Sequence, residues 1–338
     1  MILAGGMSTR LYPLTKDVPK PLVPVAGDPI TAHVIRWLKS FGYDEIAINV
    51  HYLADRIMTR LGDGSEFGVK LHYLIEPVLT GSAGGLKQLE SFFREPFIVT
   101  GCDDLTDANL DALVAFHRKS NAVATIGLVE APEVDQYGVV RTADDGRILE
   151  FQEKPPRGTE KSHLVNTGIY VFDPAIFASI PAGTFYDFGK QVFPDLLASN
   201  APFFGLRMPG AYWCDIGTPG EYRRATADAL SGRVALRGAR ARGIAADAVL
   251  GDDVQIDGDV RIGSGTVLGD RVRITGPSVV GDGVRIGAGA HLSRTIVWDG
   301  ATLGDGVDLS DAIVGIGYDL PAGARLAGAI VANEPVAR

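Results

Sequence analysis

The amino-acid sequence predicts a two-domain chain, in which an α/β sheet domain over residues 1–230 is followed by a parallel β-helix over 247–335. Two patterns carry this prediction. The first part alternates strand-like and helix-like stretches, which is typical of an α/β layer. The second part repeats a bulky residue every six positions, which is typical of a β-helix. The 338 residues are enough to bury a core in each part.

Four apolar runs in the first part have the length and composition of strands. These strand-like runs are 45–50, 70–75, 96–101 and 122–129, and the clearest helix-like stretches are 30–42 and 109–120. The second helix-like stretch begins after Asp107, which we expect to lie at its N-terminal cap. The alternation predicts a largely parallel sheet whose ligands gather at the carboxyl ends of its strands.

From Leu250 onward, the chain repeats with a period of six residues. The bulky positions are Leu250, Ile256, Ile262, Leu268, Ile274, Val280, Ile286, Leu292 and Trp298. Each hexad predicts one short strand with one inward side chain and a tight corner, where glycine is favoured. After Trp298 we expect the register to slip by one residue, to Leu303 and Leu309, in an end coil.

A linker is predicted between the two parts, at residues 231–246. Its arginines are Arg233, Arg237, Arg240 and Arg242. Such a run either binds phosphate or is a solvated connector, and the connector is the more common case.

Composition and charge disfavour several classes of function. The net charge of −9 argues against a nucleic-acid partner, because nucleic acids select basic surfaces. We expect no membrane span, because no run of about 18 apolar residues is present, and no export leader is visible at the start. Two cysteines, Cys102 and Cys214, are too few for a disulfide framework. These observations favour a cytoplasmic protein.

The stretch AGGMSTRLYPLTKDVPKPL, residues 4–22, is the first candidate for a ligand site. It matches neither the dinucleotide-binding pattern nor the ATP P-loop. Its glycines allow a sharp turn whose backbone N–H groups can approach phosphate oxygens. Arg10 adds a planar fork that suits phosphate, and the prolines on either side of Lys20 help to aim its ammonium group. The stretch therefore favours phosphate binding over a plain surface turn.

The sequence LAGGMSTRLYPLTKDVPKPLVPVAGDPI closely resembles the N-terminal motif of the sugar-nucleotide pyrophosphorylases, which are nucleotidyltransferases that act on sugar 1-phosphates. The resemblance continues in order through FQEKP, VNTGIYVF, FYDFGKQVFPDLL and YWCDIGTP, and it extends over the hexad repeats. Among the subfamilies, the chain is most similar to the two-domain mannose-1-phosphate guanylyltransferases.

The resemblance implies a Rossmann-like nucleotidyltransferase sheet domain followed by a left-handed parallel β-helix. It implies transfer of a nucleotidyl group from a nucleoside triphosphate to a sugar 1-phosphate, with GTP and mannose 1-phosphate as the leading pair. Glucose-1-phosphate thymidylyl- or uridylyltransferase activity is the alternative. We also predict that the β-helix serves either assembly, as a homo-oligomer, or regulation.

This reaction brings about six negative charges together, because a phosphomonoester carries about −2 and a triphosphate about −4. Catalysis then rests on positioning and electrostatic stabilisation. Asp103 and Asp215 match the family's two aspartates that hold Mg²⁺, and both follow strand-like stretches. Arg10 and Lys20 are expected to act on the triphosphate and Lys154 on the sugar phosphate.

The resemblance also implies two sets of binding residues. The nucleotide set is Leu3, Ala4, Gly5, Gly6, Ser8, Thr9, Glu76, Gly81 and Ser82. The sugar-phosphate set is Glu153, Asn166, Gly168 and Lys190. Asp104 and Asp107 are expected to be only turn and cap residues. Each thiol precedes a predicted metal ligand, and we expect both to face away from the carboxylates, because neighbours on a strand point to opposite faces.

The chain departs from the family pattern in three places. Relatives usually have glycine where Ser8 and Cys102 stand, and a few more residues before the first strand, so we expect the natural start to lie upstream. Two rival functions remain open. One is an acyltransferase that uses the β-helix, for which His291 is the only histidine in the regular hexads. The other is a catalytically weak regulatory subunit.

Overall fold

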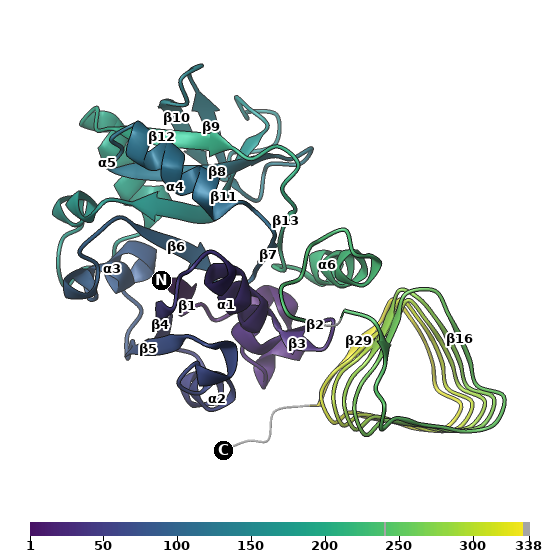
Figure 1. Ribbon diagram of the computed structural model, residues 1–338. Coiled ribbons are helices and arrows are strands. Elements are labelled where there is room, and N and C mark those ends of the chain that lie inside the picture. The colour runs from purple at the N-terminus through teal and green to yellow at the C-terminus, as the bar shows by residue number, and fades with distance from the viewer. Residues whose placement is uncertain (240, 334–338) are drawn as a thin grey trace. The chain divides into compact units, whose positions relative to one another are not determined.

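The computed structural model describes residues 1–239 and 241–333 (Figure 1). The chain divides into two compact units that do not follow the order of the sequence. The first unit is Met1–Met7 with Trp37–Asp215, and the second is Ser8–Arg36 with the described residues from Ile216 on. None of the helices in the described residues is long and apolar enough to span a membrane.

The domain bounds 1–230, 231–246 and 247–335 stay a prediction. Arg240 of the linker and residues 334–335 lie outside the described residues. Within the linker, Arg233 forms an ion pair with Asp228 at 3.1 Å, and Arg242 forms one with Asp259 at 2.6 Å.

A mixed sheet forms the first unit (Figure 1). In spatial order its path is β10 (Ile148–Glu153), β9 (Gly138–Thr142), β11 (Leu164–Phe172), β6 (Phe97–Gly101), β1 (Ile2–Ala4), β4 (Glu45–Val50) and β5 (Lys70–Ile75), and β8 (Ala124–Glu130) and β12 (Phe203–Arg207) attach through β11. The four strands from β6 to β5 are parallel, as predicted. The expectation of a largely parallel sheet is wrong beyond β6, because β11 runs antiparallel to β6, β8 and β9. A short turn joins β9 to β10, and such a turn can connect only antiparallel strands.

Several helices flank this sheet. They are α2 (Ala54–Leu61), α3 (Gly81–Lys87), α4 (Leu110–Lys119) and α5 (Phe193–Ala198), and α1 (Ile30–Ser40) begins in one unit and ends in the other. The cap of α4 is Asn109, whose side-chain oxygen accepts a hydrogen bond from the backbone N–H of Ala112. Asp107 is therefore not the cap: its carboxylate accepts a bond from the backbone N–H of Tyr212 at 2.8 Å.

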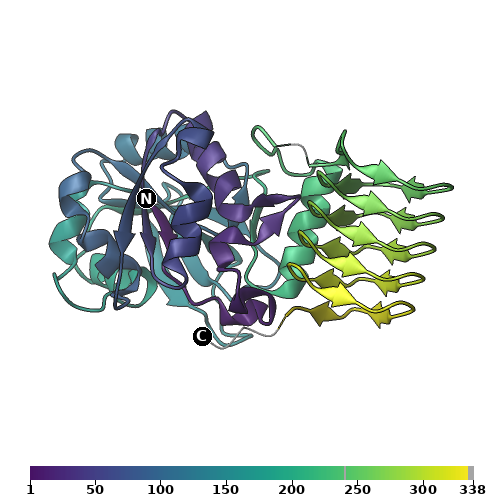
Figure 2. The same cartoon turned by 90° about the horizontal axis from the view of Figure 1, so that it is seen from below.

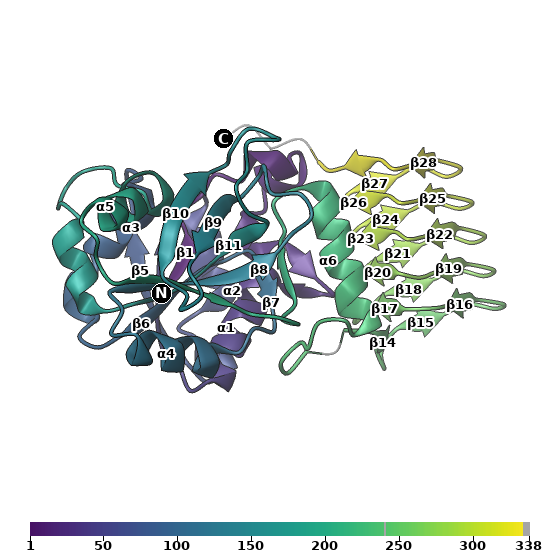
Figure 3. The ribbon, with the colours of Figure 1, turned by 90° about the horizontal axis from the view of Figure 1, so that it is seen from above.

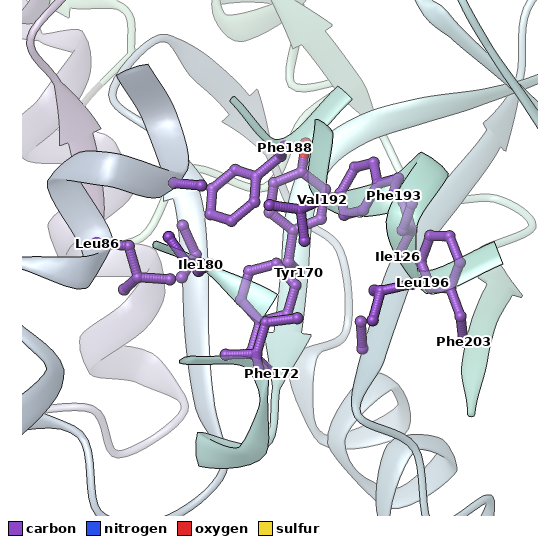
Figure 4. Packing of buried hydrophobic residues seen from close by; sticks show 14 of the residues in the cluster. Leu86, Ile126, Tyr170, Phe172, Ile180, Phe188, Val192, Phe193, Leu196 and Phe203 are labelled. Carbon is purple, nitrogen blue, oxygen red and sulfur yellow. The ribbon is translucent and has the colours of Figure 1, made fainter. Parts of the chain in front are cut away.

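Aromatic side chains fill the core of this unit beneath β11 (Figure 4). The rings of Phe172 and Phe188 stack at 5.1 Å, and those of Phe193 and Phe203 also stack at 5.1 Å. Tyr170 packs among them with its ring centroid 5.4 Å from that of Phe188. Segments distant in sequence thus pack together in one aromatic core.

The β-helix belongs to the second unit, and Figure 1 looks along its axis, where the coils superimpose as a triangle. One side is β14 (Gly243–Ile244), β17 (Val260–Ile262), β20 (Ser278–Val280), β23 (Ile296–Val297), β26 (Ile313–Val314) and β29 (Ile330–Val331). The second is β15 (Val249–Leu250), β18 (Val267–Leu268), β21 (Arg285–Ile286), β24 (Thr302–Leu303) and β27 (Asp319–Leu320). The third is β16 (Gln255–Asp257), β19 (Arg273–Thr275), β22 (His291–Ser293), β25 (Asp308–Ser310) and β28 (Arg325–Ala327). The predicted parallel β-helix is confirmed; its left hand stays a prediction.

The hexad assignment of Trp298 is wrong. Register partners Arg261 and Val279 are 18 positions apart, whereas Val279 and Ile296 are 17 apart, so the coil shortens by one residue before Trp298. Val297 takes the inward position in the core, and Trp298 lies at the following corner. The five-residue step is therefore from Leu292 to Val297, one hexad earlier than the expected step from Trp298 to Leu303.

The second unit also contains a hairpin and one long helix. The hairpin pairs β2 (Pro24–Val25) with β3 (Asp28–Pro29), and the helix is α6 (Pro219–Ser231). Thr218 caps α6 by accepting a hydrogen bond from the N–H of Glu221 while its hydroxyl donates to the Glu221 carboxylate. Pro219 at the first turn and Gly232 at φ 79° complete favourable helix ends.

Candidate functional site

A small antiparallel ladder brings the two predicted metal ligands to neighbouring positions. β7 (Asp104–Thr106) pairs with β13 (Trp213–Asp215), and Asp215 lies opposite Asp104. Asp103 immediately precedes β7. A Cβ atom at Gly101 would lie only 2.6 Å from Oδ1 of Asp103 and 2.8 Å from Oδ2 of Asp104, so the close approach of these carboxylates requires glycine there.

Asp104 is a site residue that the sequence analysis missed. It is 5% exposed, and its Oδ1 accepts a hydrogen bond from the indole N–H of Trp213 at 3.0 Å. Its Oδ2 accepts bonds from the backbone N–H of Gly101 at 3.1 Å and the hydroxyl of Thr100 at 3.5 Å. The expectation of a turn residue is wrong, because this buried carboxylate ties β6 and β13 together. Only its position next to Asp103 in the sequence hinted at the role.

The chemistry of Asp103 and Asp215 fits a magnesium ion that is completed by substrate. Mg²⁺ prefers oxygen ligands and is commonly held by one or two carboxylates together with phosphate oxygens. No group of three His, Cys, Asp or Glu side chains converges as a metal site within the described residues. Both neighbouring thiols, Cys102 and Cys214, are buried and are not joined in a disulfide. Asp103 and Asp215 would supply two carboxylates to such a site, and phosphate and water would supply the other ligands.

The predicted nucleotide residues meet at the carboxyl ends of β1 and β5. Glu76 is 2% exposed, and its Oε2 accepts a hydrogen bond from the amide of Asn49 at 2.6 Å. The Asn49 carbonyl oxygen in turn accepts a bond from the backbone N–H of Ala4 at 3.0 Å. Oε1 of Glu76 accepts the hydroxyl of Thr80 at 2.7 Å. Asn49, which the sequence analysis missed, therefore links the glycine turn after β1 to the loop that starts α3.

Apart from Ser8 and Thr9, the other members of the nucleotide set lie along this turn and at the start of α3. Ala4, the last residue of β1, is buried, and Gly5 and Gly6 follow it. A Cβ atom at Gly5 would lie 3.1 Å from the Asn49 amide nitrogen. The Leu3 carbonyl accepts a bond from the N–H of Cys102. Gly81, at φ +80°, opens α3, where a Cβ atom would lie 2.4 Å from the Tyr186 carbonyl oxygen.

Ser82 joins the nucleotide loop to the predicted sugar-phosphate residues. Its hydroxyl donates to Oδ2 of Asp187 at 2.9 Å and accepts a bond from the N–H of Phe188. Asp187 caps a turn of π-helix over Phe188–Val192, accepting bonds from the N–H groups of Gly189 and Lys190. Short π-helical segments are frequent at functional sites. Lys190 was predicted from the sequence, whereas Asp187, which accepts a hydrogen bond from its backbone N–H, was not.

Glu153 ends β10 and lies against the same turn. The residue as a whole is exposed, but a Cβ atom at Gly189 would lie 2.5 Å from its Oε2. Burial of the carboxylate on this side and the charge of Asp187 raise the pKa of Glu153, while Lys154 and Lys190 lower it. Lys154 is exposed with φ 46°, a strained conformation for a lysine, and its N–H donates to the Tyr137 carbonyl.

Asn166 and Gly168 lie at an irregularity of β11. The Asn166 amide donates to the Tyr170 hydroxyl at 3.0 Å, and its carbonyl accepts the N–H of Gly168 at 2.9 Å. Gly168 has φ +77°, and a Cβ atom there would lie 3.3 Å from Oδ2 of Asp104. Burial raises the pKa of Tyr170, which therefore stays protonated. β11 thus places the predicted sugar residues beside the carboxylate ladder.

Ser8, Thr9, Arg10 and Lys20 lie in the second unit. Ser8 has φ 55° and ψ 41°, a left-handed conformation, which explains why glycine is usual at this place. Its carbonyl accepts the hydroxyl of Thr15 at 2.7 Å. Thr9 and Arg10 are exposed, and Lys20 is only 8% exposed at the start of a short 3-10 helix.

A model described as nucleotidyl transferase matches residues 1–232, and bacterial transferase hexapeptide repeats match 259–294. UTP–glucose-1-phosphate uridylyltransferase from Synechocystis sp. is 40% identical over 245 residues, which cover 68% of this chain and 63% of that protein. Mannose-1-phosphate guanylyltransferase from Mycobacterium tuberculosis is 33% identical over 248 residues, covering 71% and 67%.

A crystal structure described as a glucose-1-phosphate thymidylyltransferase from Bacillus anthracis superimposes with a TM-score of 0.61 at 27% identity, covering 67% of this chain and 92% of that one. This chain spans less than two thirds of the Synechocystis relative's length. The family model matches residues 1–232, and the mixed sheet of this part carries glycines and carboxylates at the carboxyl ends of its strands. The chain belongs to the nucleotidyl transferase family and carries hexapeptide repeats behind that domain.

Proposed function

We propose that the protein transfers a nucleotidyl group from a nucleoside triphosphate to a sugar 1-phosphate. A phosphate oxygen of the sugar 1-phosphate forms a bond to the α-phosphorus, and the bond from that phosphorus to the bridging oxygen breaks, so pyrophosphate leaves with the electron pair. The observation that carries the proposal is the pairing of β7 with β13, which sets Asp103 and Asp215 at adjacent positions. A bound Mg²⁺ would neutralise phosphate charge as it develops.

The side chains divide the work according to charge and position. Asp103 and Asp215 hold the metal, and Arg10 and Lys20 bind the triphosphate, with Arg10 nearest to the leaving pyrophosphate. Lys154 binds the sugar phosphate, and Glu153 accepts hydrogen bonds from sugar hydroxyls. Asn166, Gly168 and Lys190 complete the sugar-phosphate set.

GTP and mannose 1-phosphate are the leading substrate pair, and a glucose 1-phosphate uridylyl or thymidylyl transfer is the second candidate. Several relatives are named mannose-1-phosphate guanylyltransferases, from Mycobacterium tuberculosis to Drosophila pseudoobscura. The 40% identity to a uridylyltransferase supports the second candidate. Both share the same chemistry and differ only in the base and sugar contacts.

A grid of substrates tests the proposal. Pyrophosphate release is measured for five nucleoside triphosphates against mannose, glucose, galactose and N-acetylglucosamine 1-phosphates, with Mg²⁺ and with EDTA. We expect one strong pair at GTP and mannose 1-phosphate, and none with EDTA. A strong pair elsewhere keeps the reaction and changes the product. A blank grid from folded protein refutes catalysis and favours a regulatory subunit.

We also propose that the protein is cytoplasmic and forms a homo-oligomer through its β-helix. Hexapeptide repeats support the assembly. Sedimentation velocity of the full chain tests it, and a monomer at micromolar concentration would contradict it.

A further inference from the structure

One of the three outer faces of the β-helix is apolar and buried, and the other two are polar and exposed. On the sheet from β14 to β29, the outward residues in register are Arg261, Val279, Ile296 and Ile313. Val279 and Ile296 are 4% exposed and Ile313 is 0% exposed. The other faces carry exposed outward rows: Val267, Arg285, Thr302 and Asp319 on one, and Arg273, His291, Asp308 and Arg325 on the other.

Helix α6 lies along the apolar face (Figures 2 and 3). Trp298, at the corner after β23, is 3% exposed, and its indole N–H donates to the hydroxyl of Tyr222 on α6 at 2.8 Å. The two rings meet edge to face with centroids 6.3 Å apart. The next residue of the helix, Arg223, donates to the Gly328 carbonyl at 3.2 Å. The β-helix and α6 therefore form one packed body.

The same tyrosine holds the hairpin near the N-terminus. The Tyr222 hydroxyl donates to the carbonyl of Pro24 at 2.6 Å, so it accepts one bond from the β-helix and donates another to β2. A second contact supports the hairpin at its turn. Gly27 has φ +89°, and a Cβ atom there would lie 2.0 Å from Nε of Arg261, so only glycine lets that arginine lie against the turn.

The hairpin is a direct continuation of the segment that carries the predicted triphosphate cations. The N–H of Val23 donates to the Lys20 carbonyl at 3.0 Å, and the N–H of Ile30 donates to the Val23 carbonyl at 2.9 Å. Pro24 is thus only four residues after Lys20, within one hydrogen-bonded stretch. A shift of the backbone at Pro24 would therefore disturb the hydrogen bonds that the carbonyls of Lys20 and Val23 accept.

We propose that Trp298 and Tyr222 are positioning residues through which the β-helix holds the Lys20 segment in the conformation that binds triphosphate. The kinetic part of this inference rests on the proposed function. The structural part, that the β-helix orders residues 20–30, does not.

Hydrogen–deuterium exchange of the full chain tests the structural part. Tyr222→Phe removes the hydrogen bonds to Trp298 and to Pro24. Trp298→Phe keeps an aromatic ring but removes the indole N–H that donates to Tyr222. We expect exchange in peptides spanning 20–30 to become about tenfold faster in Tyr222→Phe, the factor that corresponds to 1.4 kcal/mol, and at least about threefold faster in Trp298→Phe. Protection of 20–30 that is unchanged in Trp298→Phe would overturn the inference.

Tyr73→Phe is the matched control. Tyr73 also donates to a backbone carbonyl, that of Gly62 at 2.7 Å, but it lies on β5 in the first unit. Its loss should leave exchange at 20–30 unchanged. A general loosening in all three variants would show that the effect at 20–30 is not specific and would contradict the proposal.

Steady-state kinetics tests the functional part. We expect Trp298→Phe to raise KM for the nucleoside triphosphate about fivefold and to leave KM for the sugar 1-phosphate unchanged. Equal changes in both KM values would contradict a positioning role for the triphosphate segment. If the wild-type protein releases no pyrophosphate from any pair, the proposed function has failed, and the exchange experiment still decides whether the β-helix orders this segment.

Discussion

Two glutamates at the candidate site, Glu76 and Glu153, illustrate opposite uses of the same side chain. Glu76 is buried, and both of its oxygens accept hydrogen bonds from the chain itself, from Asn49 and Thr80. Glu153 is exposed, and its raised pKa reflects burial on one side and the charge of Asp187. The first carboxylate holds loops together, and the second faces solvent. Asp104 resembles Glu76 in this respect, because its oxygens accept bonds from Trp213 and Gly101.

The largest expected effect is a loss of turnover in Asp103→Asn that is not matched in a variant of its buried neighbour, Asp104. Asp103→Asn removes a charge from the proposed metal site, and we expect turnover to fall by about 10³-fold, which corresponds to roughly 4 kcal/mol, with an unchanged melting temperature. Asp104→Asn is the matched variant and should mainly lower the melting temperature. Activity assays and thermal unfolding measure both. Near-normal turnover of Asp103→Asn would refute the metal assignment.

Breaking the Glu76 network should cost stability. Glu76→Ala leaves the buried Asn49 amide and the Thr80 hydroxyl without their acceptor, and we expect unfolding to become easier by about 3 kcal/mol. Urea titration measures this free energy. Glu76→Gln retains one acceptor and should lose less. If Glu76→Ala is as stable as wild type but binds nucleotide poorly, then this carboxylate contacts the base and does not hold the loops.

Glu153→Ala should show the opposite pattern. It removes an exposed acceptor, so we expect the free energy of unfolding to change by no more than about 0.5 kcal/mol. The specificity constant for the sugar 1-phosphate should fall about 10- to 100-fold, because hydrogen bonds to charged groups contribute about 1.5–3 kcal/mol. Initial rates with each substrate varied in turn, at a saturating concentration of the other, test this. A loss confined to the nucleotide KM would place Glu153 on the other substrate.

The raised pKa of Glu153 predicts a pH dependence. The ionised carboxylate accepts sugar hydroxyls, so kcat/KM for the sugar 1-phosphate should fall as the pH drops through a pKa above the ordinary value of about 4.3. Because the folded state binds this proton more tightly than the unfolded chain, the stability contribution is present at low pH and is lost as the pH rises through the folded pKa.

Charge variants sharpen this prediction. Lys190 lowers the pKa of Glu153. Lys190→Gln should therefore move the fall in kcat/KM at low pH, the acid limb of the pH profile, to higher pH. Lys70→Gln, a change at an exposed lysine paired with Glu45 on β4, is the control and should leave the limb in place. An acid limb that is the same in all variants and persists in Glu153→Gln would belong to another group.

The smallest expected effect concerns Ser8. Ser8→Gly relieves a left-handed backbone, which costs a serine about 1 kcal/mol, but it also adds freedom to the unfolded chain. We expect a net gain in stability of about 0.5 kcal/mol, measured by thermal unfolding. Ser8→Ala, which keeps the strain, should show no gain. A loss of stability in Ser8→Gly would mean that the serine side chain contributes a compensating contact.

Periodic features were predictable from the sequence, and contacts between distant segments were not. The strands at 45–50 and 70–75 and the β-helix follow from local apolar patterns, and they are confirmed. Asn49, Asp104 and Asp187 were missed because each acts through a partner from 27 to more than 100 residues away in the chain. Trp298 was misassigned for a related reason. A period of six gives no sign that the corner between β22 and β23 has lost one residue, which moves Val297 inward and Trp298 to the next corner.

The hydrogen bond between Trp298 and Tyr222 ties α6 to one particular coil of the β-helix. Successive coils rise by the distance between hydrogen-bonded strands, about 4.8 Å, and two coil steps separate Arg261 on β17 from Ile296 on β23. Duplicating one coil between them would leave a well-formed solenoid, yet it would carry the tryptophan one rung beyond the tyrosine it now meets. The number of coils in this stretch is therefore constrained. An added coil would change which residues of the β-helix contact α6, even if its sequence still formed a regular solenoid.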